Sequence, residues 1–118
     1  METKSFLTLE DVGREDIREI LDLARAFAEG RVRDALEGKT VCLAFFEAST
    51  RTAVSFELAA RRSGAHVISL SAKGSAIAKG ESLIDTVVTL DRLGADAIVL
   101  RHQAAGAAAL AARHTSAP

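Results

Sequence analysis

Three hydroxyl side chains and a guanidinium occur together at residues 49–52, Ser-Thr-Arg-Thr. The apolar run Thr40–Phe46 before them has the length of a strand, and helical spacing of apolar residues begins at Arg51. The four residues therefore fall at a predicted helix N-terminus, where unpaired backbone N–H groups and the helix dipole favour an anion. Arg51 adds a permanent charge whose planar fork binds two oxygens of one phosphate. This combination predicts a binding site for an oxyanion.

The same four residues also fit a purely structural role. Serine and threonine ahead of a helix are ordinary N-caps, and an exposed arginine in a first turn is common. A cation in the first turn opposes the helix dipole, however, so a segment that served stability alone would more often carry Asp or Glu there. Arg51 therefore favours the anion site. Ser49 is not predicted to be a nucleophile, because no general base is identifiable beside it.

A cation follows each of the three predicted strands. Arg51 follows the first strand, two lysines lie in the loop 71–80 after the second, and Arg101 follows the third. If the strands are parallel, these residues meet at the edge of the sheet where ligands usually bind. Unit charges about 6 Å apart repel by roughly 2–3 kcal/mol at an effective dielectric near 20, so an anion between them would be stabilising. The alternative is that the cations are spread around a solvated rim, where charge costs little.

Alternating helices and strands are expected to position these residues. The elements predicted in chain order are helix Thr8–Gly30, strand Thr40–Phe46, helix Arg51–Arg62, strand His66–Leu70, helix Glu81–Leu93, strand Asp96–Leu100 and helix Ala104–Arg113. The first helix is amphipathic, and its apolar face is expected to lie on the core. Strands separated by such helices predict parallel pairing with right-handed crossovers. The predicted fold class is α/β, a three-layer open parallel sheet flanked by helices.

Composition excludes several classes of function. With 48% hydrophobic residues, 26% charged residues and a formal net charge of −1, the 118-residue chain is typical of one soluble domain. Near-zero charge and only five aromatic residues, all Phe, argue against a nucleic-acid surface. No apolar stretch approaches the ~18 residues of a membrane-spanning helix, and the chain does not start like a signal peptide. We therefore expect a cytoplasmic protein with neither a nucleic-acid partner nor a membrane partner.

The single cysteine, Cys42, lies inside the first predicted strand. No internal disulfide is possible, which fits a reducing compartment, and the thiol is expected to be buried and structural. No cluster of His, Cys and carboxylate residues has the spacing of metal ligands. We therefore expect neither a metal nor another cofactor.

At this point the residues carry a resemblance to a known family. Phe46–Thr52, Phe-Glu-Ala-Ser-Thr-Arg-Thr, followed by Ser-Phe-Glu at 55–57, resembles the carbamoyl phosphate signature of the aspartate and ornithine carbamoyltransferases. Further similar stretches, which together extend over nearly the whole chain, are Gly64–Val67, Ser75 with Lys79–Ser82, Asp96–Ala97 and Arg101–His102. Lys79–Glu81 and Arg101–His102 are closer to the aspartate enzymes than to the ornithine enzymes. The implied fold is the N-terminal carbamoyl phosphate-binding domain of this family.

The resemblance also implies roles for individual residues. The residues implied to bind carbamoyl phosphate are Ser49, Thr50, Arg51, Thr52 and Arg101. Thr52 and Arg101 would also reach the carbonyl oxygen, so these two and Arg51 are the expected catalytic residues. Ser75 and Lys79 would reach the active site of a neighbouring subunit in a homotrimer, which agrees with the long, small and polar loop that holds them.

The implied activity is that of a transferase in pyrimidine biosynthesis. The amino group of L-aspartate attacks the carbonyl carbon of carbamoyl phosphate, and phosphate leaves as N-carbamoyl-L-aspartate forms. Negative charge grows on the carbonyl oxygen and the bridging oxygen, and losing one donor fixed at such a position typically costs about 2.7–4 kcal/mol. His102 is similar to a family position beside the site, and we expect its role to be structural.

Two departures from the family pattern limit what this chain is expected to do. Ala53 replaces a second arginine, which affects local support more than phosphate contact. The sequence stops at Pro118, where family members continue into a His-Pro-Thr-Gln motif and an aspartate-binding domain. We therefore expect residues 1–118 to form a carbamoyl phosphate-binding domain that binds L-aspartate only if the second domain is supplied. We expect no carbamoylation by the chain alone, and an unfilled edge or central slot of the sheet. Glu47, which bridges to the second domain in the family, is expected to lack its partner in that domain.

Two other functions stay open on sequence alone. The chain fits half of an ornithine carbamoyltransferase or of another carbamoyltransferase, because the absent domain selects the acceptor amine. It also fits a non-catalytic module that binds anions or supports assembly, since open α/β sheets host many functions.

Overall fold

The structure is a computed structural model that describes residues 5–70 and 82–118. Its elements in chain order are the 3₁₀ helix η1 (Leu9–Asp11), α1 (Arg14–Ala28), β1 (Thr40–Phe45), α2 (Thr50–Arg62), β2 (His66–Leu70), α3 (Leu83–Arg92), β3 (Ala97–Arg101) and α4 (Ala107–His114). Every predicted strand and helix is present. The predicted helix Thr8–Gly30 is divided into η1 and α1. The second of these begins after Gly13, whose N–H donates to the carboxylate of Asp16 at 3.0 Å.

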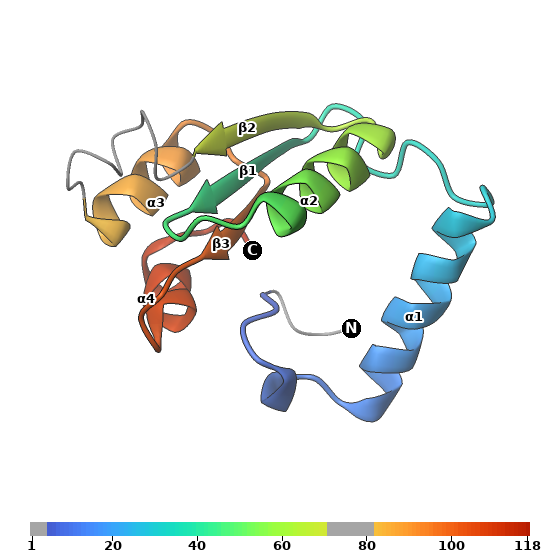
Figure 1. Cartoon of the computed structure of the whole chain (residues 1–118), viewed down its shortest axis with the longest axis horizontal. Helices are drawn as coiled ribbons and strands as arrows, with labels where there is room; N and C mark the ends of the chain where they lie inside the picture. The colour runs from blue at the N-terminus through green and yellow to red at the C-terminus, as the bar shows by residue number, and fades with distance from the viewer. Residues whose placement is uncertain (1–4, 71–81) are drawn as a thin grey trace.

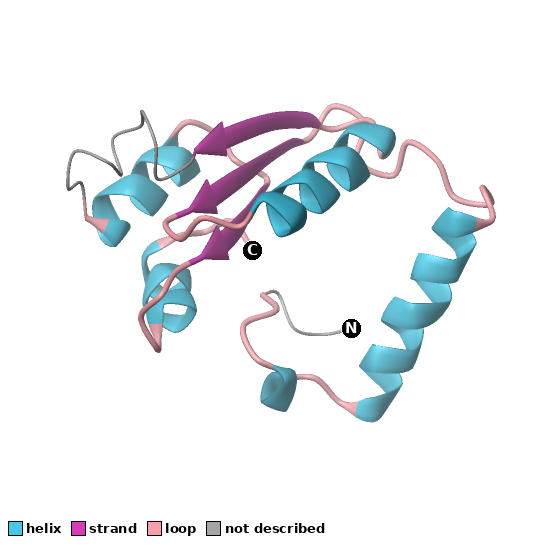
Figure 2. Cartoon of the chain, viewed as in Figure 1, coloured by secondary structure: helices cyan, strands magenta, loops and turns pink. Residues whose placement is uncertain are grey.

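The three strands form a parallel sheet in the order β2-β1-β3, so the predicted fold class is confirmed (Figures 1 and 2). Val41 pairs with Val67 of β2 on one side and with Ala97 of β3 on the other. β1 is therefore the central strand. This position explains its nearly uninterrupted apolar sequence, since both of its faces are covered.

Alternate side chains of β1 belong to two hydrophobic clusters. Val41, Leu43 and Phe45 lie in one cluster with Ala60 of α2. Cys42 and Ala44 lie in the other, with Leu90 of α3. Helix α2 thus covers one face of the sheet, while α3, which contacts α4, covers the other. Residues of β1 are at most 7% exposed after Thr40, so this strand is the centre of the core.

The two strands that follow β1 in the chain lie on opposite sides of it in the sheet. It passes through α2 to β2 on one side of β1, and then through α3 to β3 on the opposite side. The carboxyl ends of β1 and β3 therefore flank the point where the strand order reverses, which is where open α/β sheets bind ligands. The residues that follow β1 and end β3 are thus placed to form a site.

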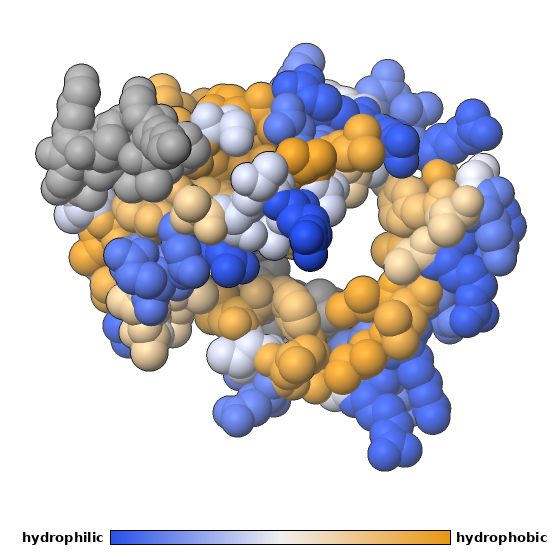
Figure 3. All heavy atoms as spheres, in the orientation of Figure 1, coloured by the Kyte–Doolittle hydropathy of each residue, from blue (hydrophilic) through white to orange (hydrophobic). Residues whose placement is uncertain are grey.

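Helix α1 does not lie on the core, so the predicted packing of its apolar face is wrong. Ala26 is its one buried residue, and its exposed apolar side chains are Ile17, Ile20, Leu21, Leu23 and Phe27. The helix stands apart from the sheet (Figure 1), and hydrophobic side chains line its inward side (Figure 3). An amphipathic pattern identifies which face is apolar but does not specify what covers it, and no described element does so here.

The last residues of the chain lie against the outer edge of β3. Both carboxylate oxygens of Asp91, in the last turn of α3, accept hydrogen bonds from Ser116, and Oδ1 also accepts the N–H of Ala117. The N–H of Ile98 donates to the carbonyl of Pro118 at 2.9 Å. The start of the β3 edge is therefore paired. Only the part of this edge beyond Ile98 matches the expectation of an unfilled edge.

Candidate anion-binding site

Among the residues that the structure describes, no side chain caps the first-turn N–H groups of α2. Ser49 occupies the N-cap position, but its hydroxyl donates to Thr52 Oγ1 at 2.9 Å and caps no backbone group. No acidic residue lies in the first turn. The ordinary N-cap interpretation therefore does not describe Ser49. A helix N-terminus in this state attracts an anion through its N–H groups and its dipole.

Thr50 and Arg51 are exposed on the first turn of α2. Within residues 5–70 and 82–118, Arg51 forms no ion pair. A cation without a carboxylate partner, placed where the helix dipole already disfavours it, leaves the positive charge available to a ligand.

Arg101 is the final residue of β3 rather than the residue after it. It is in register with Phe45, and its carbonyl accepts the N–H of Phe46 at 2.8 Å. Its Nη2 lies 3.6 Å from Oε1 of Glu47, and both side chains are more than 40% exposed. Glu47 thus forms an ion pair within the chain, an interaction that the sequence did not predict. The reason is that adjacent parallel strands end side by side and place these opposite charges within reach.

Arg101 lines two neighbouring cavities. The first, of about 480 Å³, is also lined by Thr52 and Phe56 of α2 and extends along β3 to α4. The second, of about 450 Å³, lies between Glu47, His102 and the start of α4. The structure therefore brings Thr52 and Arg101 to one cavity, and Ser49 joins them through its bond to Thr52. The side chains of Thr50 and Arg51 lie outside both linings, and Ser75 and Lys79 lie outside the described residues.

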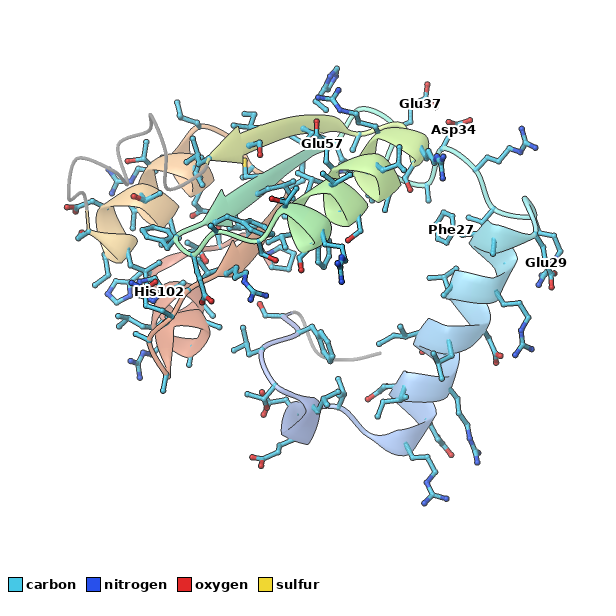
Figure 4. All side chains as sticks on the ribbon, in the orientation of Figure 1. Phe27, Glu29, Asp34, Glu37, Glu57 and His102 are labelled. Carbon is cyan, nitrogen blue, oxygen red and sulfur yellow. The ribbon has the colours of Figure 1, made fainter. Side chains whose placement is uncertain are left out.

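His102 lies beside Arg101 at the carboxyl end of β3 (Figure 4). Its ring centroid is 5.1 Å from that of Phe46, with the planes tilted by 42°. Its Nδ1 accepts the N–H of Ala104 at 2.9 Å. The imidazole thus contacts the end of β1 and closes the turn that leaves β3.

Cys42 is buried, and burial raises the pKa of its thiol, so it is a poor nucleophile at neutral pH. Among the residues that the structure describes, no group of His, Cys, Asp and Glu could hold a metal ion. The same ranges hold no helix long and apolar enough to cross a membrane.

The ion pair between Glu47 and Arg101 was missed in the sequence analysis. The signal was present, because an acidic residue follows β1 and a basic residue ends β3. Recognising it required the strand order, since opposite charges at strand ends meet only if the strands are neighbours.

Comparison with known proteins decides the family. The model of the aspartate/ornithine carbamoyltransferase carbamoyl-P binding domain matches residues 4–118. The chain belongs to the aspartate/ornithine carbamoyltransferase family. The match extends over nearly the whole sequence and includes both the residues after β1 and the end of β3.

Carbamoyltransferase relatives support the resemblance to the aspartate enzymes. The aspartate carbamoyltransferase catalytic subunit of Rubrobacter xylanophilus is 73% identical over 117 residues, which cover 99% of this chain and 38% of the relative. The corresponding subunit of Chloroflexus aggregans is 51% identical over 113 residues, 92% of this chain and 37% of the relative. The chain thus spans less than two-fifths of the length of these relatives.

Solved carbamoyltransferase structures share the fold. The catalytic subunit of M. jannaschii aspartate transcarbamoylase superposes with a TM-score of 0.88 at 45% identity, covering 98% of this chain and 39% of the other. The aspartate transcarbamoylase from Trypanosoma cruzi, in complex with carbamoyl phosphate and aspartate, gives a TM-score of 0.83 at 36% identity. The match covers 98% of this chain and 39% of the other. The prediction of a parallel α/β domain of this family is confirmed.

Proposed function

We propose that residues 1–118 form the carbamoyl phosphate-binding domain of an aspartate carbamoyltransferase. The phosphate binds at the N-terminus of α2, to Ser49, Thr50, Arg51 and Thr52, and Arg101 reaches it from the end of β3. The observation that carries the proposal is the uncapped first turn of α2 beside Arg101, at the point where the strand order reverses. The relative solved with carbamoyl phosphate and aspartate supports the identity of the ligand.

In the reaction, these groups stabilise charge and take no part in covalent bonding. The amine nitrogen of L-aspartate bonds to the carbonyl carbon, the bond from that carbon to the bridging oxygen breaks, and the proton that the amine loses passes to the departing phosphate. Thr52 and Arg101 donate to the carbonyl oxygen, and Arg51 neutralises the departing phosphate. Donors fixed at these positions bind the transition state more tightly than the substrate.

The complete reaction needs parts that this sequence does not contain. The longer relatives carry more than three-fifths of their length outside the matched region, and L-aspartate binds there in our proposal. Ser75 and Lys79 act in the site of a neighbouring subunit, so the working form is a homotrimer. The setting is cytoplasmic pyrimidine biosynthesis.

Calorimetric titration of the 118-residue chain with carbamoyl phosphate, phosphate and sulfate tests the binding step. We expect carbamoyl phosphate to bind most tightly, and Arg101→Ala to weaken it by roughly tenfold or more, since a charge-assisted hydrogen bond contributes about 1.5–3 kcal/mol. The matched control is Arg61→Ala, because Arg61 is an exposed arginine of α2 paired with Glu57. Equal affinity for the three anions would identify a generic anion site, and no binding would contradict the proposal.

A further inference from the structure

The ends of β1 and β3 are joined at three points close to the anion site. The N–H of Phe46 donates to the carbonyl of Arg101, the ring of Phe46 contacts that of His102, and Glu47 pairs with Arg101. His102 adds a fourth constraint, because its Nδ1 accepts the N–H of Ala104 and closes the turn after β3. The position of Arg101 therefore depends on its neighbour His102.

The bond to Ala104 specifies the proton state of His102. A backbone N–H can only donate, so Nδ1 must carry a lone pair, and the ring is neutral with its proton on Nε2. A doubly protonated ring would place an N–H against the N–H of Ala104 and lose the bond. His114 shows the opposite arrangement, because its Nδ1 lies 2.9 Å from the carbonyl of Leu110, which can only accept.

We infer that His102 is a positioning residue for Arg101. As the Nε2–H tautomer, it holds the turn 102–104 through its Nδ1, while its ring only packs beside Phe46. The turn held by Nδ1 fixes the direction in which the Arg101 side chain leaves β3, where it pairs with Glu47 and lines the cavity shared with Thr52. The inference rests on the proposed function, because it concerns how Arg101 is oriented for the anion.

The two contacts of His102 can be separated by substitution. His102→Asn places an acceptor oxygen close to the position of Nδ1 but removes the ring. His102→Phe keeps the ring on Phe46 but removes the acceptor, and His102→Gln places its oxygen near Nε2, out of reach of Ala104. If the acceptor positions Arg101, the asparagine variant retains function while the other two lose it. A residue that serves only as packing would retain function as His102→Phe and lose it as His102→Asn.

The first measurement is phosphate affinity by calorimetry, with circular dichroism to show that each variant is folded. His102→Phe and His102→Gln are expected to weaken phosphate binding by roughly three- to tenfold, the effect of one lost hydrogen bond, and His102→Asn by less than about twofold. The matched control, His114→Ala, should leave affinity unchanged. Equal affinity of the Asn and Phe variants, or weaker binding by Asn than by Phe, would overturn the inference.

The second measurement needs no ligand, so it separates this inference from the proposed function. Nitrogen-15 spectra of the wild-type imidazoles should show an unprotonated Nδ1 in His102 and a protonated Nδ1 in His114. The Nε–H signal of Arg101 should move in His102→Phe and His102→Gln and stay in place in His102→Asn. A protonated Nδ1 in His102, or an unmoved Arg101 signal in all variants, would contradict the positioning role even if phosphate binds. Failure of the wild-type chain to bind phosphate, with these signals as expected, would count against the proposed function alone.

Discussion

Glu47 and Arg101 face each other across the carboxyl edge of the sheet, with Oε1 and Nη2 3.6 Å apart. The carboxylate lines the cavity next to the one that Thr52 and Arg101 share, so it competes for the Arg101 charge and would repel an anion bound there. Because both side chains are more than 40% exposed, the pair itself contributes little to the free energy of unfolding. We therefore expect its main effect to be on ligand binding.

Glu47→Gln should therefore tighten phosphate binding. Removing the competing charge leaves Arg101 available, and we expect affinity to rise by about two- to fivefold, the range of an exposed ion pair. Calorimetric titration at low ionic strength measures the change, since salt screens such charges. Glu57→Gln, which breaks the ion pair with Arg61 on α2, is the matched control and should have no effect. Weaker binding by Glu47→Gln would show that the carboxylate supports the anion site.

Ser49→Ala should separate binding from helix capping. An N-cap serine that bonds the backbone typically contributes about 0.5–2 kcal/mol, but the Ser49 hydroxyl donates to Thr52 instead. We expect less than about 0.5 kcal/mol of lost stability on urea unfolding, together with clearly weaker phosphate binding. Ser82→Ala is the matched control, because the Ser82 hydroxyl accepts the N–H of Asp85 at the start of α3. This variant should lower the free energy of unfolding by about 1 kcal/mol. Equal destabilisation by the two variants would restore the capping interpretation.

Asp91→Ala should release the last residues of the chain from β3. The carboxylate accepts bonds from the backbone and hydroxyl of Ser116 and from the N–H of Ala117. It also lies near the C-terminus of α3, where a negative charge is unfavourable unless donors surround it. We expect a loss of roughly 1–2 kcal/mol on unfolding and faster amide exchange at Ser116 and Ala117. Unchanged exchange at these two amides would show that the Asp91 bonds are not what holds the segment.

Gly64→Ala should be more destabilising than Gly94→Ala. Both glycines have positive φ, +85° and +100°, so both variants carry backbone strain of about 1 kcal/mol. An added Cβ at Gly64 would lie 3.2 Å from Cα of Glu37, whereas one at Gly94 meets nothing within 4 Å. For Gly64→Ala we expect the free energy of unfolding, measured with urea, to fall by roughly 2–3 kcal/mol, since backbone atoms must move. Equal losses at the two positions would indicate that the segment around Glu37 yields freely.

Much of the fold follows from the sequence because local patterns carry it. The uninterrupted apolar run of β1 indicates a strand covered on both faces, and the helical spacing after Arg51 indicates α2 within one residue of its start. The position of α1 was not predictable in this way, because its covering surface is a tertiary property. The hydrogen bonds of Asp91 with Ser116 and Ala117, which lie 25 and 26 positions later in the chain, likewise depend on the path of the chain after α4.

The position of the candidate site in the fold could be predicted from the sequence, but the contacts within it could not. Hydroxyls and cations after parallel strands predict an anion site at the sheet edge, and the structure brings Thr52 and Arg101 to one cavity there. The bond between Ser49 and Thr52, the ion pair of Glu47 and the turn closed by His102 depend on side-chain directions that spacing does not specify. The roles of all the site residues, Ser49, Thr50, Arg51, Thr52, Arg101, Ser75 and Lys79, stay predictions.

The central claim is that the first turn of α2 and Arg101 bind one phosphate together. Titrating the isotope-labelled chain with inorganic phosphate, while recording backbone amide and arginine Nε–H signals, tests it most directly. We predict that the amides of Arg51 and Thr52 and the Nε–H of Arg101 shift together along one saturating curve. Shifts confined to other parts of the chain, or separate curves for α2 and Arg101, would contradict the account.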